Sequence, residues 1–100
     1  MSRFTGTPEQ RRLRALLRQI RVEAGMKQAD LAQRLKQSQS FVSKYESGER
    51  RLDLLELRDI CAAVGLTLAE FIRRFDQSFD EARSTVPKPA KALLGKRPKY

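Results

Sequence analysis

The sequence contains no histidine, no tryptophan and only one cysteine among its 100 residues. Without histidine, the common histidine-based metal sites and a histidine general base are both excluded. A single cysteine, Cys61, excludes an intrachain disulfide and a cysteine-rich zinc site. The sequence also lacks a nucleophile elbow, a glycine-rich phosphate loop and a convergent pair of acids. We therefore expect no enzymatic activity, no metal and no cofactor.

Long apolar runs are missing as well. No stretch has the length of the apolar part of a signal peptide or of a membrane-spanning helix. We therefore expect a soluble, cytoplasmic protein without membrane contact. Cys61 lies on the apolar face of its predicted helix and is expected to be a buried, inert thiol.

The residues in excess are basic: 21 Lys and Arg against 12 Asp and Glu, a formal net charge of +9. This balance indicates a polyanionic partner. The charge is uneven, because residues 9–76 hold fourteen basic and ten acidic residues, whereas residues 84–100 hold five basic residues and no acid. With Pro87, Pro89 and Pro98, the second range is interpreted as a basic, largely disordered tail. It either contacts phosphate non-specifically or only keeps the protein soluble.

Apolar residues recur at helical spacing and predict an all-α fold of five helices. Capping residues are expected to begin four of them, and glycines to end three. The caps are Thr7, Ser38, Asp53 and Thr67, and the glycines are Gly25, Gly48 and Gly65. We expect one domain over residues 7–83, between a flexible N-terminus at 1–6 and the tail at 84–100. A domain this small often gains stability by dimerising.

Residues 28–47 predict two short helices, Gln28–Leu35 and Gln39–Ser47, joined by a tight turn. Each has one apolar face, and Ala32, which has no side chain beyond Cβ, lets the helices cross closely. The outward face of the second helix carries polar side chains and no acid: Gln39, Ser40, Ser43, Lys44 and Ser47. Such a face can read base edges in a major groove.

This segment resembles the helix-turn-helix of the lambda repressor and Cro group of XRE-like transcriptional regulators. The resemblance is carried by Gln28, Leu31, Ala32, Lys36-Gln37-Ser38, Val42-Ser43, Tyr45-Glu46 and Gly48-Glu49-Arg50. It covers about residues 13–76 and implies a lambda-repressor-like five-helix DNA-binding domain. Two positions depart from the pattern: Lys27 replaces the usual Ser or Thr cap, and Lys36 stands where glycine is common in the turn.

The candidate DNA contacts fall into two groups. Gln39, Ser40, Ser43 and Lys44 are expected to face base edges, because Gln suits adenine and Lys suits guanine. Residues that flank this recognition helix are expected to contact phosphates: Gln28, Ser47, Arg50 and Arg51. Gln28 begins a helix, where backbone N–H groups favour an anion. Phe41 has two interpretations, packing on the scaffold or lying along the sugar-phosphate wall.

The resemblance also implies an ion pair behind the recognition helix. In the family, an Arg at the place of Arg21 often pairs with the Glu that ends this helix, here Glu46. A bidentate pair of this kind would tie the recognition helix to the scaffold.

The fifth predicted helix carries more apolar surface than a domain of this size needs. Its aromatic residues are Phe71, Phe75 and Phe79. One apolar stripe can close the core, and aromatic surface left outside it usually marks an interface. We favour a dimer contact through these residues over simple core closure.

These features favour a sequence-specific regulator of transcription that binds double-stranded DNA. The resemblance implies a homodimeric repressor that reads a palindromic operator through the major groove. The alternative on the same fold is a protein-interaction module: an antitoxin whose fifth helix and tail hold a toxin, or a bridging coactivator that contacts polymerase machinery.

Overall fold

The computed structural model describes the backbone of residues 6–82 and the side chains of residues 6–79. Five helices fill this range: α1 (Pro8–Glu23), α2 (Gln28–Leu35), α3 (Gln39–Ser47), α4 (Leu54–Ala63) and α5 (Leu68–Ala82). The range contains no strand, so the predicted all-α fold is confirmed. The predictions for residues 1–5 and for the tail at 84–100 lie outside the described residues. None of the described helices is long and apolar enough to cross a membrane.

Side chains placed just before the first turn fix where four of the helices begin. The hydroxyls of Thr7, Ser38 and Thr67 each accept the backbone N–H three residues on, at 3.0, 3.2 and 3.0 Å. Asp53 does the same for Glu56 at 2.8 Å, and the Glu56 carboxylate accepts the N–H of Asp53 at 2.9 Å. Each contact satisfies an N–H that the helix itself leaves without a partner.

The two lysines that depart from the family pattern bound α2. Lys27 has an ammonium, which cannot accept a hydrogen bond, and Asp30 accepts the Lys27 N–H at 2.9 Å instead. Lys36 ends the helix in the left-handed conformation, with φ 58° and ψ 42°. This conformation is strained for a residue with a Cβ, so Lys36 fills a position that glycine would fill at lower cost.

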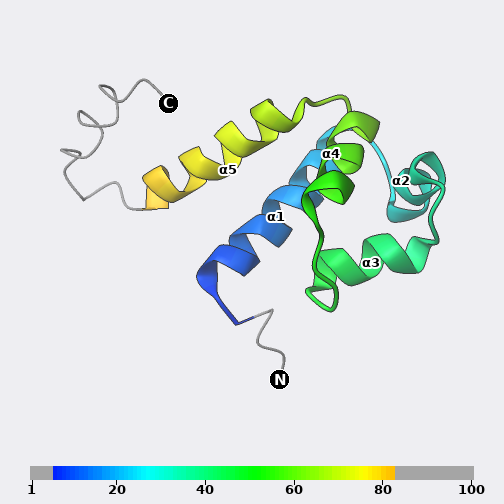
Figure 1. Cartoon of the computed structure of the whole chain (residues 1–100), viewed down its shortest axis with the longest axis horizontal. Coiled ribbons are helices and arrows are strands. Elements are labelled where there is room, and N and C mark those ends of the chain that lie inside the picture. Colours follow the sequence, from blue (N-terminus) through cyan, green and yellow to red (C-terminus); the bar gives the residue numbers. More distant parts are fainter. Residues whose placement is uncertain (1–5, 83–100) are drawn as a thin grey trace.

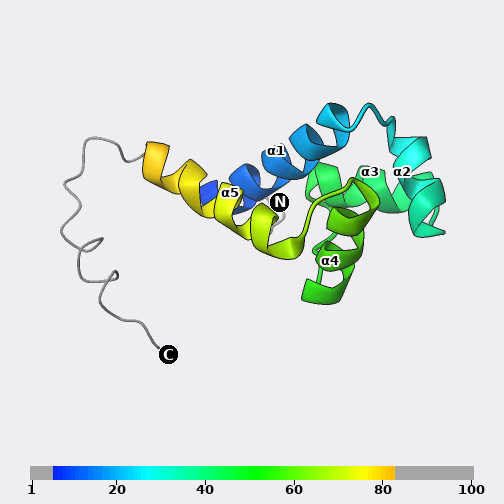
Figure 2. The same cartoon turned by 90° about the horizontal axis from the view of Figure 1, so that it is seen from above.

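The helices pack as two adjoining groups (Figure 1). α5 runs beside α1, which agrees with the contacts between these helices. α4 packs on α5 and on α2, and α1 packs directly on α3, so both connections join this pair to the crossed helices α2 and α3. The view from above shows α2 and α3 at the opposite end of the molecule from the C-terminal end of α5 (Figure 2). The helix-turn-helix therefore lies at one end, and the last turns of α5 lie far from it.

Every helix contributes to the buried core. The core residue from α5, Phe71, corrects the expectation that this ring belongs to a dimer contact. Phe71 is fully buried, with 0% of its surface exposed, so it is a core residue of the monomer and not a surface contact of a dimer. Phe71 is the residue through which α5 enters the core. Replacing such a buried Phe by Ala typically lowers the free energy of unfolding by about 3–5 kcal/mol. The buried apolar residues are Leu16, Leu17, Ile20, Leu31, Ala32, Val42, Tyr45, Ile60, Cys61 and Phe71.

Candidate nucleic-acid interface

α3 buries one face and presents the other to solvent. Val42 and Tyr45 are 0% and 1% exposed and hold the helix against the core. The four residues expected to meet base edges, Gln39, Ser40, Ser43 and Lys44, are all exposed. Within the described part of the chain, their side chains make no hydrogen bond or ion pair. The face is thus polar and contains no acid, and its side chains have donors and acceptors available for a ligand.

Behind α3, Arg21 on α1 and Glu46 form the pair that the resemblance implies. Arg21 Nε donates to Glu46 Oε2 at 2.8 Å and Nη2 donates to Oε1 at 3.0 Å, a bidentate arrangement. Their side chains are only 10% and 6% exposed. Arg21 Nη1 also donates to the carbonyl of Met26 at 2.9 Å, so the pair reaches the segment before α2 as well. The hydrogen bond to Glu46 raises the pKa of Arg21, and burial opposes this rise.

Gln28, at the start of α2, joins the same network. Its Nε2 donates to Glu46 Oε1 at 3.1 Å, and the residue is half-buried. Glu46 therefore accepts from both α1 and α2. In this arrangement the Gln28 amide links the N-terminus of α2 to α3, and one of its two N–H groups is used by Glu46.

The chain turns back on α3 directly after Ser47. Gly48 has φ 93°, and the N–H groups of Glu49 and Arg50 both donate to the carbonyl of Lys44, at 2.9 and 3.2 Å. Only glycine adopts this φ without strain. The exposed Ser47 hydroxyl donates to the same carbonyl at 3.1 Å. This closure places the loop beside the last turn of α3.

Arg50 is engaged on several sides by its own loop and by α4. Its Nη1 and Nη2 donate to the two carboxylate oxygens of Glu56 at 3.0 and 2.8 Å, and Nη1 also donates to the Arg51 carbonyl at 2.9 Å. The guanidinium carbon lies 4.7 Å from the centre of the Phe41 ring. Phe41 in turn meets Tyr45 edge-on, with ring centres 5.4 Å apart. Phe41 therefore packs on the scaffold while staying half-buried.

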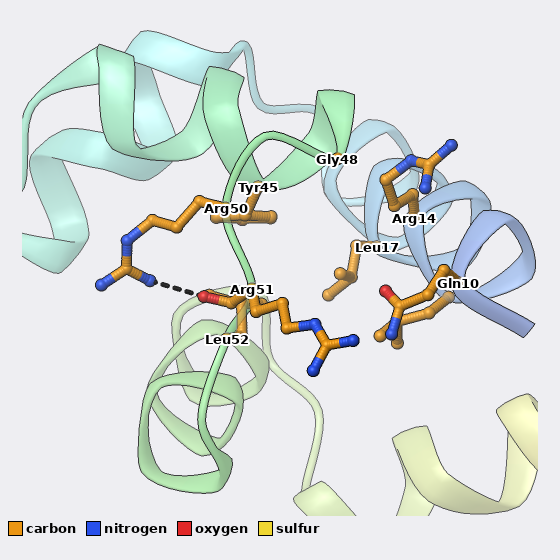
Figure 3. Close-up of a pocket in the computed structure, with 9 residues that line it drawn as sticks. Gln10, Arg14, Leu17, Tyr45, Gly48, Arg50, Arg51 and Leu52 are labelled. Atoms are coloured by element: carbon orange, nitrogen blue, oxygen red, sulfur yellow. Dashed lines mark hydrogen bonds between the residues drawn. The ribbon is translucent and has the colours of Figure 1, made fainter. Parts of the chain in front are cut away.

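A cavity of about 160 Å³ lies between α1 and this loop, lined by Gln10, Leu13, Arg14, Leu17, Tyr45, Gly48, Arg50, Arg51 and Leu52. Figure 3 shows Arg50 and Arg51 leaving the loop on opposite sides, with Arg51 directed toward Gln10 and Arg50 away from α1. Two adjacent arginines that look equivalent in the sequence thus occupy different surroundings.

α5 leaves a partly exposed apolar stripe at Ile72, Phe75 and Phe79. Ile72 is 45% exposed, whereas Phe75 and Phe79 are half-buried and meet edge-on, with ring centres 4.8 Å apart. Arg12 of α1 covers the Phe79 ring at 5.3 Å. A second exposed apolar pair, Leu54 and Leu55 at 62% and 68%, begins α4. Sequence reasoning missed this pair, although two adjacent leucines in a first turn cannot both face inward.

Comparison with known proteins places the chain in a family. The HTH_3 family model, described as helix-turn-helix, matches residues 17–71, slightly more than half of the chain. An XRE-family like protein from Pseudomonas syringae pv. tomato str. DC3000 is 38% identical, with 70% of this chain and 85% of that chain covered and a TM-score of 0.66. No curated protein matches the chain.

Two further solved structures share the fold. The clp gene regulator ClgR from C. glutamicum is 25% identical, covers 72% of this chain with 92% of its own, and gives a TM-score of 0.63. The restriction-modification controller protein C.Esp1396I, solved as a tetramer in complex with its natural 35 base-pair operator, is 22% identical. The match covers 71% of this chain and 93% of the controller protein, with a TM-score of 0.65.

Proposed function

We propose that this chain acts as a homodimeric repressor that reads a palindromic operator. It belongs to the HTH_3 family of helix-turn-helix proteins and is an XRE-like DNA-binding transcription regulator. The observation that carries the proposal is the outward face of α3. It presents four exposed polar side chains without an acid, on a helix whose other face is locked into the core. A rigid polar helix face of this kind fits the edges of base pairs in a major groove.

The proposed contacts divide by their chemistry. Gln39, Ser40, Ser43 and Lys44 meet base edges and discriminate between sequences, because each base pair offers a different pattern of donors and acceptors there. Gln28, Ser47 and Arg51 flank α3 and hold the phosphate backbone on any sequence. The basic surplus of the whole chain, a net charge of +9, supports such a polyanionic partner.

Lys44 provides the test of base reading. In Lys44→Ala, preference at one position of each half-site should fall, by about 1–3 kcal/mol if the contact is bidentate, while non-specific binding changes little. Arg73→Ala is the matched control, because Arg73 is an exposed cation on α5, whereas the helices that pack closely on α3 are α1 and α2. Binding to a library of single-base operator variants at two salt concentrations measures both. If both variants lost the same affinity for every operator in the library, the result would contradict base reading and favour the protein-interaction module.

For the dimer we propose the stripe of Ile72, Phe75 and Phe79 on α5. Ile72 is the residue to change, because it is the most exposed of the three and its replacement leaves the Phe75–Phe79 contact intact. Ile72→Glu should yield a folded monomer with weakened operator binding, whereas Leu55→Glu, on the other exposed apolar pair, should leave the dimer unchanged. Sedimentation at micromolar concentration measures the mass of each variant. A monomeric Leu55→Glu with a dimeric Ile72→Glu would place the interface on α4 instead. A two-fold dimer should read half-sites about 34 Å apart.

A further inference from the structure

Arg50 is a residue type that often contacts phosphate, but its contacts are with groups of the protein itself. Its two terminal nitrogens donate to both oxygens of Glu56, at 3.0 and 2.8 Å, and one of them also donates to the Arg51 carbonyl. An arginine neutralised by a bidentate carboxylate adds little net positive charge to a DNA-binding surface. A phosphate would have to compete with a partner that is already bound in the best geometry a guanidinium offers.

Glu56 is itself held in place, which makes it a firm partner. Its Oε1 accepts the N–H of Asp53 at 2.9 Å, and Asp53 accepts the N–H of Glu56 at 2.8 Å, so the carboxylate belongs to the capping box of α4. The hydrogen bonds from Arg50 and from the Asp53 N–H lower the pKa of Glu56. The capping box therefore orients the Glu56 carboxylate independently of Arg50.

On its other side, Arg50 meets the first turn of α3. Its guanidinium carbon lies 4.7 Å from the centre of the Phe41 ring, within the distance of a cation–π contact. Phe41 rests edge-on against the buried Tyr45, and its N–H is capped by the Ser38 hydroxyl at 3.2 Å. The ring is thus held between the core and Arg50, directly after Gln39 and Ser40 in the chain.

We propose that Arg50 is a positioning residue for the recognition helix: through Phe41 it fixes the first turn of α3 against α4, and so sets where Gln39 and Ser40 meet the bases. The inference rests on the proposed DNA-binding function. It replaces the expectation that Arg50 contacts a phosphate. One guanidinium joins α3, the loop and α4, and this explains why an arginine, rather than a lysine, suits the position: only the planar fork can stack on a ring and bind a carboxylate bidentately at once.

The test compares Arg50→Lys and Glu56→Gln with Glu49→Gln. Lysine keeps the charge of Arg50 but loses the fork, and Glu56→Gln removes the ionic partner. Glu49→Gln is the charge-matched control, because Glu49 is an exposed acid in the same loop, and among the described residues its side chain hydrogen-bonds only to Ser47, at 3.5 Å. For each variant, affinity is measured for the operator, for each single-base change in it, and for non-operator DNA.

Arg50→Lys and Glu56→Gln should both lower discrimination at the base read from the first turn of α3, by about 5–10-fold, and leave discrimination at the Lys44 position unchanged. The slope of affinity against salt should stay at the wild-type value. Glu49→Gln should strengthen binding to all DNA slightly and equally. Phe41→Leu, which keeps apolar bulk but removes the ring, should reproduce the first-turn loss, and thermal melting shows that each variant is folded.

A phosphate contact would give the opposite pattern. Arg50→Lys would then bind like the wild type, and Glu56→Gln would strengthen binding to all sequences as Glu49→Gln does, with discrimination intact. That result overturns the positioning role while leaving the proposed function standing. If the wild-type protein selects no operator at all, it is the proposed function that fails.

Discussion

The pair of Arg21 and Glu46 allows a quantitative prediction, because both side chains are almost buried and their hydrogen bonds are well defined. Glu46→Gln removes the charge but keeps one acceptor oxygen, so Arg21 retains its bond to the Met26 carbonyl at 2.9 Å and part of its bond to residue 46. Arg21→Met removes the guanidinium and leaves the Glu46 carboxylate with Gln28 alone, at 3.1 Å. The second change should therefore be the more damaging.

Removing one partner of a buried ion pair typically costs about 3–5 kcal/mol, because the other charge is left without compensation. These side chains keep 10% and 6% of their surface exposed, which places Arg21→Met near the lower end, at about 3 kcal/mol. Glu46→Gln should cost about 2 kcal/mol, the value of a charge-assisted hydrogen bond. A domain of roughly 80 residues has a total stability of about 4–12 kcal/mol, so either loss is a large fraction.

The double variant separates a real pair from two independent effects. Once Glu46 is neutral, removing Arg21 leaves no orphaned charge, so the double variant should cost about 3–3.5 kcal/mol rather than the sum of about 5. The expected coupling is thus about 1.5–2 kcal/mol. Urea unfolding followed by far-ultraviolet circular dichroism measures all four proteins, and melting temperatures should fall by about 4–8 °C per kcal/mol.

A control pair joins the C-terminal end of α1 to α5. Arg74 of α5 donates to Glu23 at 3.1 and 3.2 Å, but the two side chains are 32% and 51% exposed. In water the ions of such a pair are well solvated when separated, so the same double-mutant cycle should show no measurable coupling. Additive effects of Arg21→Met and Glu46→Gln, within about 0.5 kcal/mol, would refute the reasoning.

Three further predictions concern other parts of the fold. Lys36→Gly should raise the free energy of unfolding by about 0.5–1 kcal/mol by relieving the strain at φ 58°, and Gly65→Ala, at φ 86°, should lower it; a Lys36→Gly urea midpoint at or below the wild-type value would contradict this. Cys61 is 0% exposed and burial raises its pKa to about 11, so a thiol reagent at pH 8 should modify it only as fast as the protein unfolds; rapid modification of the native protein would show the packing to be wrong. The pKa of Glu56 is lowered below its ordinary value of 4.5, first by the hydrogen bond from Arg50, so its stabilising contribution is complete above that pH and is lost as the pH falls through the lowered value. Between pH 5 and pH 3, Glu56→Gln should therefore lose less stability than the wild type in urea titrations, and equal losses would count against the Arg50–Glu56 pair.

The helix boundaries were predictable because local chemistry sets them. Ser38 caps α3 and Gly48 ends it, as their positions in the sequence predict, since both effects act within one turn of the chain. The left-handed conformation of Lys36 could not be derived from propensity, because lysine disfavours it. It depends on how the chain passes from α2 to α3, which cross closely at the buried Ala32.

The parts that escaped prediction depend on how distant elements meet. Apolar spacing placed Phe71, Phe75 and Phe79 on one stripe of α5, but spacing does not say which ring reaches the core, and Phe71 alone is fully buried. Likewise, Arg50 and Glu56 are six residues apart with a loop and a cap between them. No helical or strand period pairs such residues, so a basic loop residue looks like a phosphate contact until its partner is located.

The contacts of α3 explain how so short a helix can hold a fixed direction. A helix of nine residues is not stable alone, so its orientation must come from its neighbours. Its last turn is tied to α1 through the buried pair of Glu46 with Arg21, and its first turn meets Arg50 through Phe41. Between these two anchors, Val42 and Tyr45 face the core, which leaves the remaining positions to solvent. The residues that stabilise α3 and those proposed to read DNA are therefore separate sets, so its outward face can differ in sequence without loss of the fold.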